Sequence, residues 1–473
     1  MENQVILVGA GIVGNYIAIL LHNLGYDVTV YERGLSPTET NQQGKSINLA
    51  YSMRGQVSIE KAGITITDTV PMHGRLLHGE TSTKFLVYSQ FGEALLSINR
   101  NGFNAKLFQH AEKLGIKYYF QHYVDNIDKN KKILSITNNG ITQQIPYELL
   151  LGTDGSNTKV GNHLESGSSS DKIEPAWQYI ELEIKPDHDN KFKLPDAENF
   201  HIWPKSQHVF LIGLPNSDGS FTLTLFVHSD ANIDLRSIQN KNDYAKFYDI
   251  IDSVVKNKSE LEQIDIETSF RNNKVSFIYT RASTIFMDND KLPSIGLIGD
   301  ALVAPPPFLG LACNAHMEAA YHFTETINKY NHLSKIDAFR TALVEFYQVY
   351  MPNMIALLDA SIDNAKVLSH SDPDYELKYQ LTQYLEKREV GLFVEEHSLY
   401  SFTTIPLFQA RNRQLWQSKI LSELVEFPGI REKYAGLCGE YDSTIAFGQL
   451  ILDEQFILEN DRQLQWYQKQ MNM

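Results

Sequence analysis

Three glycines near the N-terminus have the spacing of a phosphate-binding turn. Gly9, Gly11 and Gly14 follow the apolar run 4–8 and precede the segment 16–24, whose apolar residues repeat as in a helix. In such a unit the first glycine allows a tight turn, the second lets the backbone approach a pyrophosphate, and the third lets helix and strand pack closely. The helix N-terminus then presents free amide groups to the phosphates. The spacing therefore predicts a dinucleotide site.

The residues after this turn complete the unit. A second apolar run, 27–31, ends at Glu32, about 20 residues after the glycines, where a carboxylate accepts hydrogen bonds from a ribose diol. Val13 lies within the glycine motif and is expected beside the same ligand. A glycine-rich turn without a ligand is the alternative. The agreement of strand, turn, helix, second strand and terminal Glu32 favours the dinucleotide.

Two aspartates favour FAD over NAD as that dinucleotide. Asp154 follows the apolar run 147–151 and Asp300 follows the run 294–298, so each stands at the carboxyl end of an expected strand. Ligands of open α/β sheets bind at these ends, where a carboxylate can hold a ribitol hydroxyl. Either aspartate alone is typical of a solvated turn. The pair, in this order along the chain, favours FAD.

Longer segments resemble the kynurenine 3-monooxygenase-like class A FAD-dependent aromatic hydroxylases, from residue 1 to about residue 410. The segment 44–55 is similar to the flavin-contacting segment of that family. The segments 201–205, 214–216 and 220–226 are similar to strands of its substrate domain. The resemblance implies that FAD is also contacted by Arg33, Ala50, Arg54 and Arg100.

The same resemblance implies a monooxygenase reaction. FAD would be tightly bound, and NADPH would dock transiently and reduce it; the sequence does not separate NADPH from NADH. O2 would form a flavin hydroperoxide, which passes one oxygen atom to the ring of L-kynurenine or a closely related aromatic amino acid. Because an aniline ring is electron-rich, orienting the ring and excluding water matter more than acid–base help.

Four residues correspond to the positions with which the family grips the substrate carboxylate. Arg75, Tyr88 and Asn364 match the family, and Phe408 stands where a second Tyr is expected. The planar fork of an arginine can hold a carboxylate by two charge-assisted hydrogen bonds. Taken alone, Arg75 is typical of a surface charge and Tyr88 of a packing residue. Three matches at family spacing favour substrate binding.

The segment 299–314 is expected beside the flavin ring. Pro307, Phe308 and Gly310 match family positions and are expected at the catalytic centre, and Asn314 also matches and is expected at FAD. This loop opens a helix whose N-terminal amides would face the flavin and stabilise negative charge there.

Replaced residues in the same loop leave a second hypothesis open. Val303, Leu311 and Ala312 stand where the family has His, Gln and Gly, and Cys313 follows them. We expect Leu311, Ala312 and Cys313 still to contact FAD, with Cys313 as a packing residue. The alternative is a FAD-binding scaffold that oxidises a different aromatic metabolite or has a non-hydroxylating role.

The chain is expected to be an α/β protein with three parts. A Rossmann-like FAD-binding domain, of the glutathione-reductase-like type with two dinucleotide-binding halves, is expected from 1–70, 95–165 and 286–330. An inserted antiparallel-sheet substrate domain is expected from 71–94 and 175–285, because strand-like alternation dominates there. A helical region is expected from 331–473.

Composition excludes several other functions. The net charge of −15 over 473 residues argues against nucleic-acid binding. Two cysteines without CxxC spacing argue against a zinc site or a redox disulfide, and no metal is expected. The segment 446–454 runs into charged residues far short of the ~20 apolar residues of a membrane span. A cytoplasmic enzyme is expected, and a homodimer stays open.

Overall fold

The computed structural model describes residues 3–42, 48–79, 82–88, 92–164, 176–206, 208–238, 243–283, 293–368, 374–388, 393–426 and 430. Some sequence expectations fall wholly or partly outside these ranges. They include the first residues of the segment 44–55, the C-terminal segment 446–454 and the last part of the helical region 331–473.

A five-stranded parallel sheet forms around the N-terminal strand. Its order is β19-β12-β1-β2-β8. The strands are β1 (Gln4–Val8), β2 (Asp27–Tyr31), β8 (Lys117–Tyr119), β12 (Leu149–Gly152) and β19 (Ile295–Leu297). Residues 5–8 and 149–152 are buried, because helices cover both faces of such a sheet and continuous apolar runs suit this environment. The carboxyl ends of β1, β12 and β19 therefore lie side by side, as expected.

Helices and two small sheets surround the parallel sheet. The helices are α1 (Ile12–Asn23), α2 (Pro37–Gln42), α3 (Met53–Lys61), α4 (Arg100–Lys113), α5 (Lys159–Leu164) and α9 (Ala312–Lys329), and α1 packs against both α4 and α9. One small sheet has the order β3-β7-β4, from β3 (Asn48–Tyr51), β4 (Val70–Met72) and β7 (Leu95–Asn99). The other is an antiparallel meander of β9 (Tyr123–Asp128), β10 (Ile133–Asn138) and β11 (Ile141–Pro146).

A seven-stranded sheet forms the second large layer, in the order β17-β13-β16-β15-β14-β5-β6. Its strands are β5 (Gly74–His78), β6 (Thr83–Val87), β13 (Trp177–Ile184), β14 (Phe200–Ser206), β15 (Val209–Pro215), β16 (Phe221–His228) and β17 (Ser276–Phe277). The expectation of an antiparallel sheet is wrong at one pair, since β14 and β5 run parallel. These two strands come from separate stretches of the chain, and a long connection permits parallel pairing.

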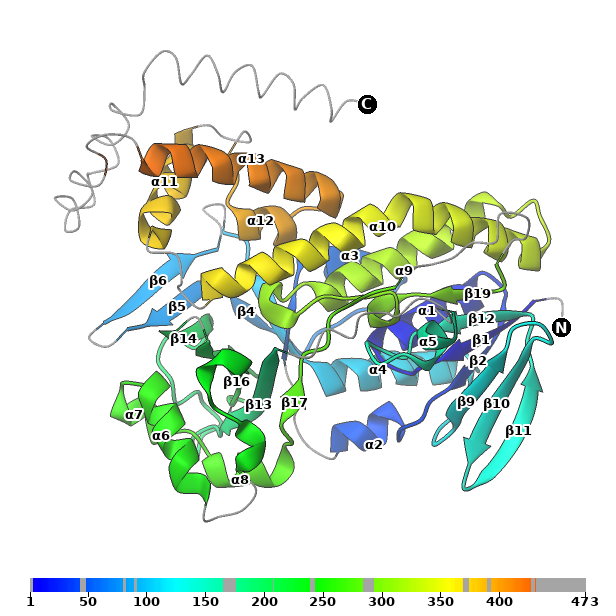
Figure 1. The fold of residues 1–473 in the computed structure, drawn as a ribbon, viewed down its shortest axis with the longest axis horizontal. Helices are drawn as coiled ribbons and strands as arrows, with labels where there is room; N and C mark the ends of the chain where they lie inside the picture. The colour runs from blue at the N-terminus through cyan, green and yellow to red at the C-terminus, as the bar shows by residue number, and fades with distance from the viewer. Residues whose placement is uncertain are drawn as a thin grey trace.

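Short elements complete the two layers. Helices α6 (Tyr244–Val254), α7 (Lys258–Leu261) and α8 (Ile266–Asn272) lie beside the seven-stranded sheet (Figure 1). Phe247 and Ile251 of α6 join the apolar core of this sheet. A two-stranded ladder joins β18 (Arg281–Ala282) to β20 (Val303–Ala304). Two 3-10 turns, η4 (Gly299–Ala301) and η5 (Pro307–Leu309), flank β20.

The chain after α9 is helical in its described part. It forms α10 (Lys335–Leu368), α11 (Tyr375–Arg388), α12 (Glu396–Ser401) and α13 (Leu407–Val425), and Figure 1 shows α10 lying along α9. The side chains of Ser334 and Asp337 bond to each other at 2.7 Å at the start of α10, and the Asp337 amide donates to the Ser334 hydroxyl at 3.1 Å. Among the described helices, none combines the length and apolar character that a membrane span requires.

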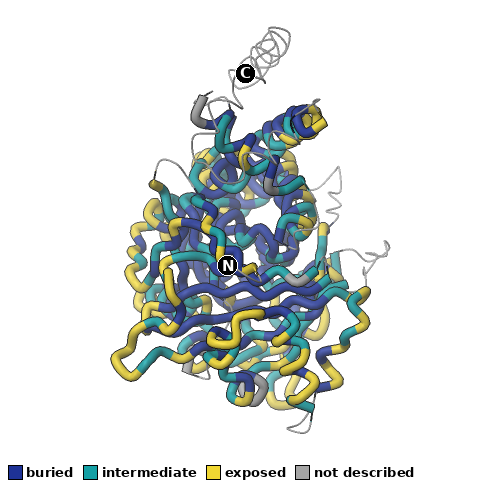
Figure 2. Tube along the Cα trace, turned by 90° about the vertical axis from the view of Figure 1, so that its left-hand side faces the viewer, coloured by how far each residue is buried: buried dark blue, intermediate teal, exposed yellow. Residues whose placement is uncertain are grey.

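Three apolar cores hold these layers together, and a fourth lies between α11 and α13. The largest joins the parallel sheet to α1, α9 and α10. Figure 2 shows buried stretches of the chain, in dark blue, through the centre of the molecule. A second core lies between the seven-stranded sheet and α6. The third connects one face of that sheet with Phe308 and with Leu368 at the end of α10. This third core forms one wall of the cavity described next.

Candidate active site

A cavity of about 590 Å³ runs from the glycine turn to the face of the seven-stranded sheet. Residues from all three expected parts of the chain line it. The predicted site residues at its wall are Gly9, Gly11, Val13, Glu32, Arg33, Ala50, Arg75, Tyr88, Arg100, Asp154, Asp300, Pro307, Phe308, Gly310, Ala312, Cys313 and Asn364. Five predicted residues do not line it, namely Gly14, Arg54, Leu311, Asn314 and Phe408.

The three glycines of the N-terminal turn have three different surroundings. Gly9 has φ +109°, and a Cβ there would meet the Thr153 carbonyl oxygen at 2.5 Å. A Cβ on Gly14 would meet the Gly9 oxygen at 2.1 Å, so Gly14 serves helix packing rather than the cavity wall. A Cβ on Gly11 would meet no atom within 4 Å, because this residue faces the cavity. Of these three glycines, only Gly11 has open space where a Cβ would stand, so a ligand can approach the backbone there.

Two helix N-termini open on the cavity without a side-chain cap. Helix α1 begins after Gly11 and helix α9 after Leu311; neither helix has a capping side-chain hydrogen bond or an acidic residue in its first turn. Their free amides and positive dipole ends favour negative charge at both places. A pyrophosphate at α1 and the electron-rich carbonyl edge of a flavin at α9 fit these two sites.

Glu32 connects the second strand to the glycine turn. Its Oε2 accepts a hydrogen bond from the Ala10 amide at 2.8 Å, and its Oε1 accepts one from the Gly34 amide at 2.7 Å. The carboxylate therefore fixes the turn while lying at the cavity wall, where lone pairs remain for a ribose diol. Arg33, the next residue, also lines the cavity.

The two predicted aspartates have different environments. Asp154 accepts hydrogen bonds from the Thr158 hydroxyl and the Lys159 amide, both at 2.6 Å, and burial raises the pKa of Asp154. Asp300 has its Oδ1 3.0 Å from Nε2 of His316. Burial opposes its ionisation, but His316 and Arg100 outweigh burial and lower the pKa of Asp300. Asp300 is thus held as a carboxylate at the cavity wall.

The loop before α9 places its matching residues at the cavity. Gly310 has φ +70°, a left-handed conformation that ends η5, and Pro307, Phe308 and Gly310 all line the wall. Ala312 is the first residue of α9 and has no positive φ, so the replacement of a family glycine there introduces no backbone strain. Burial raises the pKa of Cys313 to about 12, so its thiol stays protonated near neutral pH.

Two of the replaced residues of this loop are buried away from the cavity. Val303 is fully buried in β20, where it pairs with Ala282, and Leu311 is 1% exposed in the main core. Leu311 does not line the cavity in which the cofactor is expected, because the turn into α9 directs its side chain into the core. Neither replacement puts a new side chain into the cavity.

Arg54 and Asn314 also lie behind the cavity wall. Arg54 is fully buried; its Nη1 lies 3.1 Å from Glu318, and its Nε donates to the Tyr400 oxygen at 2.8 Å. Arg54 does not line the cavity in which FAD is expected, because its side chain joins α3 to α9 and to the C-terminal helices. Asn314 accepts from the Ser52 amide at 2.9 Å and donates to the Ala50 oxygen at 2.8 Å. Asn314 thus positions Ala50, which does line the cavity.

Arg75 is the buried cation at the other end of the cavity. Its Nη2 donates to Oε1 of Glu395 at 3.1 Å, and its guanidinium lies 5.5 Å from the centre of the Tyr88 ring. The Tyr88 ring stacks on His397 at 4.8 Å. Asn364 donates to the Phe308 oxygen at 2.7 Å, which ties α10 to the flavin-side loop. Arg75, Tyr88, Asn364 and His397 all line the same cavity.

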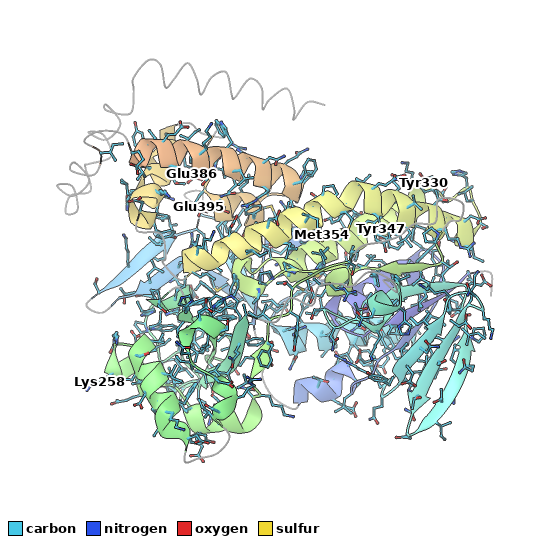
Figure 3. All side chains as sticks on the ribbon, viewed as in Figure 1. Lys258, Tyr330, Tyr347, Met354, Glu386 and Glu395 are labelled. Atoms are coloured by element: carbon cyan, nitrogen blue, oxygen red, sulfur yellow. The ribbon has the colours of Figure 1, made fainter. Side chains whose placement is uncertain are left out.

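At the Arg75 end of the cavity, the buried guanidinium of Arg75 is paired with the carboxylate of Glu395. Burial opposes the charge of Arg75, but Tyr375 and Glu395 raise its pKa, so it stays protonated. Burial and the Arg75 charge lower the pKa of His397 to about 3, so its ring is neutral. Figure 3 shows Glu395 beside Glu386, whose Oε1 accepts a hydrogen bond from the Glu395 amide at 3.2 Å.

Phe408 is outside this group. It lies on α13 with 36% of its surface exposed, and its amide donates to Asn353 at 3.2 Å. It does not line the cavity in which the substrate is expected, because the first turn of α13 directs this residue outward, while Leu407 beside it is buried. The resemblance matches a segment of the chain and not the direction of each side chain. A shift of one position along a helix rotates the side chain by about 100° around the helix axis.

Several lining residues were missed by the sequence analysis. The seven-stranded sheet contributes Tyr179, Phe200, Ile212, Leu214 and Phe226, and the C-terminal helices add Leu368 and His397. The sequence pattern could have indicated the residues of the strands, because Ile212 and Leu214 are two positions apart and lie on the same face of β15. The sequence could not show which face meets the flavin-side loop, because the partner of that face lies far away in the chain.

Comparison with known proteins agrees with the fold. A model of the FAD binding domain family matches residues 2–329. The chain therefore belongs to this family of FAD-binding proteins, and the glycine turn, the uncapped helix N-termini and Asp300 fit FAD. It is similar to the kynurenine 3-monooxygenases of Cytophaga hutchinsonii (30% identity, 91% of this chain and 95% of the relative) and Christiangramia forsetii (29%, 92% and 96%). At this similarity the chain belongs to the kynurenine 3-monooxygenase family.

Solved structures show the same fold at lower identity. P. aeruginosa PqsL has a TM-score of 0.59 and 16% identity, over 77% of this chain and 96% of that one. The tetrameric form of 2-methyl-3-hydroxypyridine-5-carboxylic acid oxygenase has a TM-score of 0.58 and 17% identity, over 80% and 95%. These likenesses concern the fold alone.

Proposed function

We propose that this chain is an FAD- and NADPH-dependent hydroxylase of L-kynurenine or a closely related aromatic amino acid. One observation carries the proposal: a single cavity joins the dinucleotide turn at Gly11 to the buried cation Arg75. A flavin ring beside Phe308 and an aromatic amino acid whose carboxylate reaches Arg75 would share this cavity. When bound, reduced FAD supplies the O2 activation that aromatic hydroxylation requires.

The residues of the chain would bind the substrate, orient its aromatic ring and exclude water from it. Arg75 would hold the substrate carboxylate, with Tyr88 and Asn364 beside it at the same wall. Tyr179, Phe226 and other apolar side chains of the sheet face would confine the aromatic ring and keep water from it. The free amides of α9 would stabilise negative charge on the cofactor. A division into a discontinuous FAD domain, a sheet domain and a helical region agrees with these roles.

One observation favours the second candidate, a relative that acts on a different aromatic metabolite. Glu395 already occupies one edge of the Arg75 guanidinium, and Phe408 supplies no group to the cavity. A substrate without an α-carboxylate would leave this ion pair undisturbed. The second candidate keeps FAD and the oxygen chemistry and changes the group that the Arg75 end recognises.

The deciding experiment is NADPH oxidation by the purified FAD-bound protein, with and without L-kynurenine, with the product identified by mass. Stimulated oxidation that yields substrate plus one oxygen atom would support the hydroxylase. Stimulation without that product would make kynurenine an effector only and favour the second candidate. No stimulation in a protein that keeps FAD would reject kynurenine as substrate.

A further inference from the structure

Two histidines stand opposite each other at one end of the seven-stranded sheet, and neither lines the cavity. The register of β15 and β16 pairs Val209 with Val227, which places His208 across from His228. The His228 amide donates to the His208 oxygen at 2.7 Å. Their rings are 5.3 Å apart with an angle of 30° between planes. Two imidazoles therefore face the same side of the sheet at neighbouring positions.

A carboxylate completes the group. Asp230 lies in the 3-10 turn η1 (Ser229–Ala231), which follows β16 and bends the chain back over His228. Its Oδ2 is 3.4 Å from Nδ1 of His228, and its amide donates to the same nitrogen at 3.2 Å. One ligand atom from each of His208, His228 and Asp230 lies within 4.8 Å of the other two.

We propose that His208, His228 and Asp230 form a binding site for a divalent transition-metal ion. A tetrahedral zinc ion with ligands at about 2.0–2.2 Å holds its ligand atoms roughly 3.3–3.6 Å apart. The present spacing comes within reach of this geometry by side-chain rotation, because the Asp230 side chain is 68% exposed and its carboxylate lies 3.4 Å from His228. The pairing of β15 with β16 already places the two histidines opposite each other. Less of the chain therefore has to become ordered when an ion binds.

The ligand types define the class of ion. Imidazole nitrogens favour Zn²⁺, Ni²⁺ and Cu²⁺, whereas Mg²⁺ and Ca²⁺ prefer sites made of oxygen. Three protein ligands leave a fourth position for water, and Asp230 contributes the single negative charge. The absence of CxxC spacing argues only against a thiolate site, and no local sequence pattern indicates this group. It becomes visible once β15 and β16 pair.

A tryptophan beside the site provides a local reporter. Trp177 on β13 is the cross-strand partner of His228, and the two rings are 4.9 Å apart in an edge-on arrangement. The same Trp177 ring lies 5.0 Å from Phe308 in the cavity wall. A paramagnetic Ni²⁺ or Cu²⁺ ion bound at His228 would quench Trp177 fluorescence. The chain has four tryptophans, so a Trp177→Phe variant identifies this contribution.

The experiment uses the full FAD-bound chain without a polyhistidine tag. Calorimetric titration with Zn²⁺ should show saturable binding of one ion per chain, and Ni²⁺ should quench Trp177 and be displaced by Zn²⁺. Mg²⁺ should give neither signal. His228→Ala or His208→Ala should weaken Zn²⁺ binding roughly 10- to 100-fold, and Asp230→Asn should weaken it less. Trp177→Phe should lose the quenching but keep the calorimetric binding.

A matched control lies in the loop that follows β13. His188 and Asp189 form an exposed pair with Nε2 3.7 Å from Oδ2. Among the described residues, no second histidine joins them in a group of three possible metal ligands. His188→Ala should leave Zn²⁺ binding unchanged. The proposal is overturned if the native chain shows no saturable binding, or if a His208→Ala/His228→Ala double variant binds Zn²⁺ as well as the native chain. Equal loss in His188→Ala would likewise overturn it.

Discussion

Arg75 donates a hydrogen bond from Nη2 to Oε1 of Glu395 across 3.1 Å, and both side chains are more than 90% buried. The other carboxylate oxygen of Glu395 accepts the Ser398 amide at 2.8 Å, which caps α12. Within the described residues, Nε of Arg75 has no hydrogen-bond partner. Glu395 therefore fixes one edge of the guanidinium and leaves donor capacity for a ligand in the cavity.

Replacing Arg75 by Met should abolish the stimulation of NADPH oxidation by substrate and leave FAD bound. The variant loses two charge-assisted hydrogen bonds of about 1.5 kcal/mol each, or roughly 100-fold in substrate affinity, and leaves Glu395 without its cation. Substrate titration followed by flavin absorbance measures the loss. Arg75→Lys keeps the charge without the planar fork and should retain part of the binding. Unchanged stimulation in Arg75→Met would remove Arg75 from the site.

Glu395 should set the preference of the site for zwitterions over simple anions. The Arg75–Glu395 pair is neutral, so a neutral amino acid zwitterion suits it better than a bare carboxylate does. Glu395→Gln leaves an uncompensated positive charge. We compare the affinities for the amino acid substrate and for its analogue without an α-amino group. In Glu395→Gln we expect the ratio of these two affinities to shift by about tenfold in favour of the analogue, equivalent to about 1.4 kcal/mol. The two dissociation constants in both proteins give this ratio. An unchanged ratio would limit Glu395 to a structural role.

Phe408→Tyr should not change substrate affinity. A motif comparison suggests that the added hydroxyl restores a missing contact, but the residue lies on the outer side of α13 and not at the cavity. A hydroxyl there would meet solvent. The measurement is the substrate dissociation constant of Phe408→Tyr beside that of the native protein. Tighter binding would show that α13 turns Phe408 toward the cavity when substrate is bound.

Gly11→Ala and Gly14→Ala should fail in different ways. A methyl group on Gly11 meets no atom of the chain and the backbone there has φ −71°, so the variant should fold with native stability and lose FAD. A methyl group on Gly14 would meet the Gly9 oxygen at 2.1 Å, so that variant should lose stability itself. Thermal unfolding of the FAD-free forms, together with the flavin content, separates the two. Full FAD retention by Gly11→Ala would contradict the proposed pyrophosphate position.

The sequence allowed the parallel sheet and the FAD end of the cavity to be predicted, because local patterns determine them. Gly11, Glu32 and Asp300 each follow an apolar run, and parallel strands bring such residues to one edge. The Arg75 end was predicted from a family resemblance, and its ion pair with Glu395 was not. These two residues are 320 positions apart, and no local pattern connects them.

The errors have the same physical origin. Arg54 and Leu311 belong to segments that contact FAD in the family, yet a segment match does not determine which face of a helix or turn each residue occupies. The partners Glu318 and Tyr400 hold Arg54 away from the cavity. The parallel pairing of β5 with β14 depends on how two distant segments dock, and alternation along each strand is the same for either direction.

Glu396 should make the protein less stable as the pH rises from 4.5 to about 7. Burial, and then the neighbouring Glu395, raise the pKa of Glu396 from 4.5 to about 7 in the folded chain. A carboxyl that binds its proton more tightly when folded lowers the free energy of unfolding as pH increases from 4.5 to about 7. Glu396→Gln removes this dependence and should gain of the order of 1–3 kcal/mol at pH 8 relative to pH 5.

Denaturant unfolding of Glu396→Gln and the native chain at pH 5 and pH 8 measures this gain. Glu423→Gln is the control, because Glu423 lies on α13 with a side chain that is 65% exposed and pairs with Lys419 at 3.9 Å. Exposed pairs of this kind contribute about 0–1 kcal/mol, so the control should change little between the two pH values. A Glu396→Gln protein whose stability falls with pH as steeply as that of the native chain would show that Glu396 ionises as readily in the folded protein as in the unfolded one.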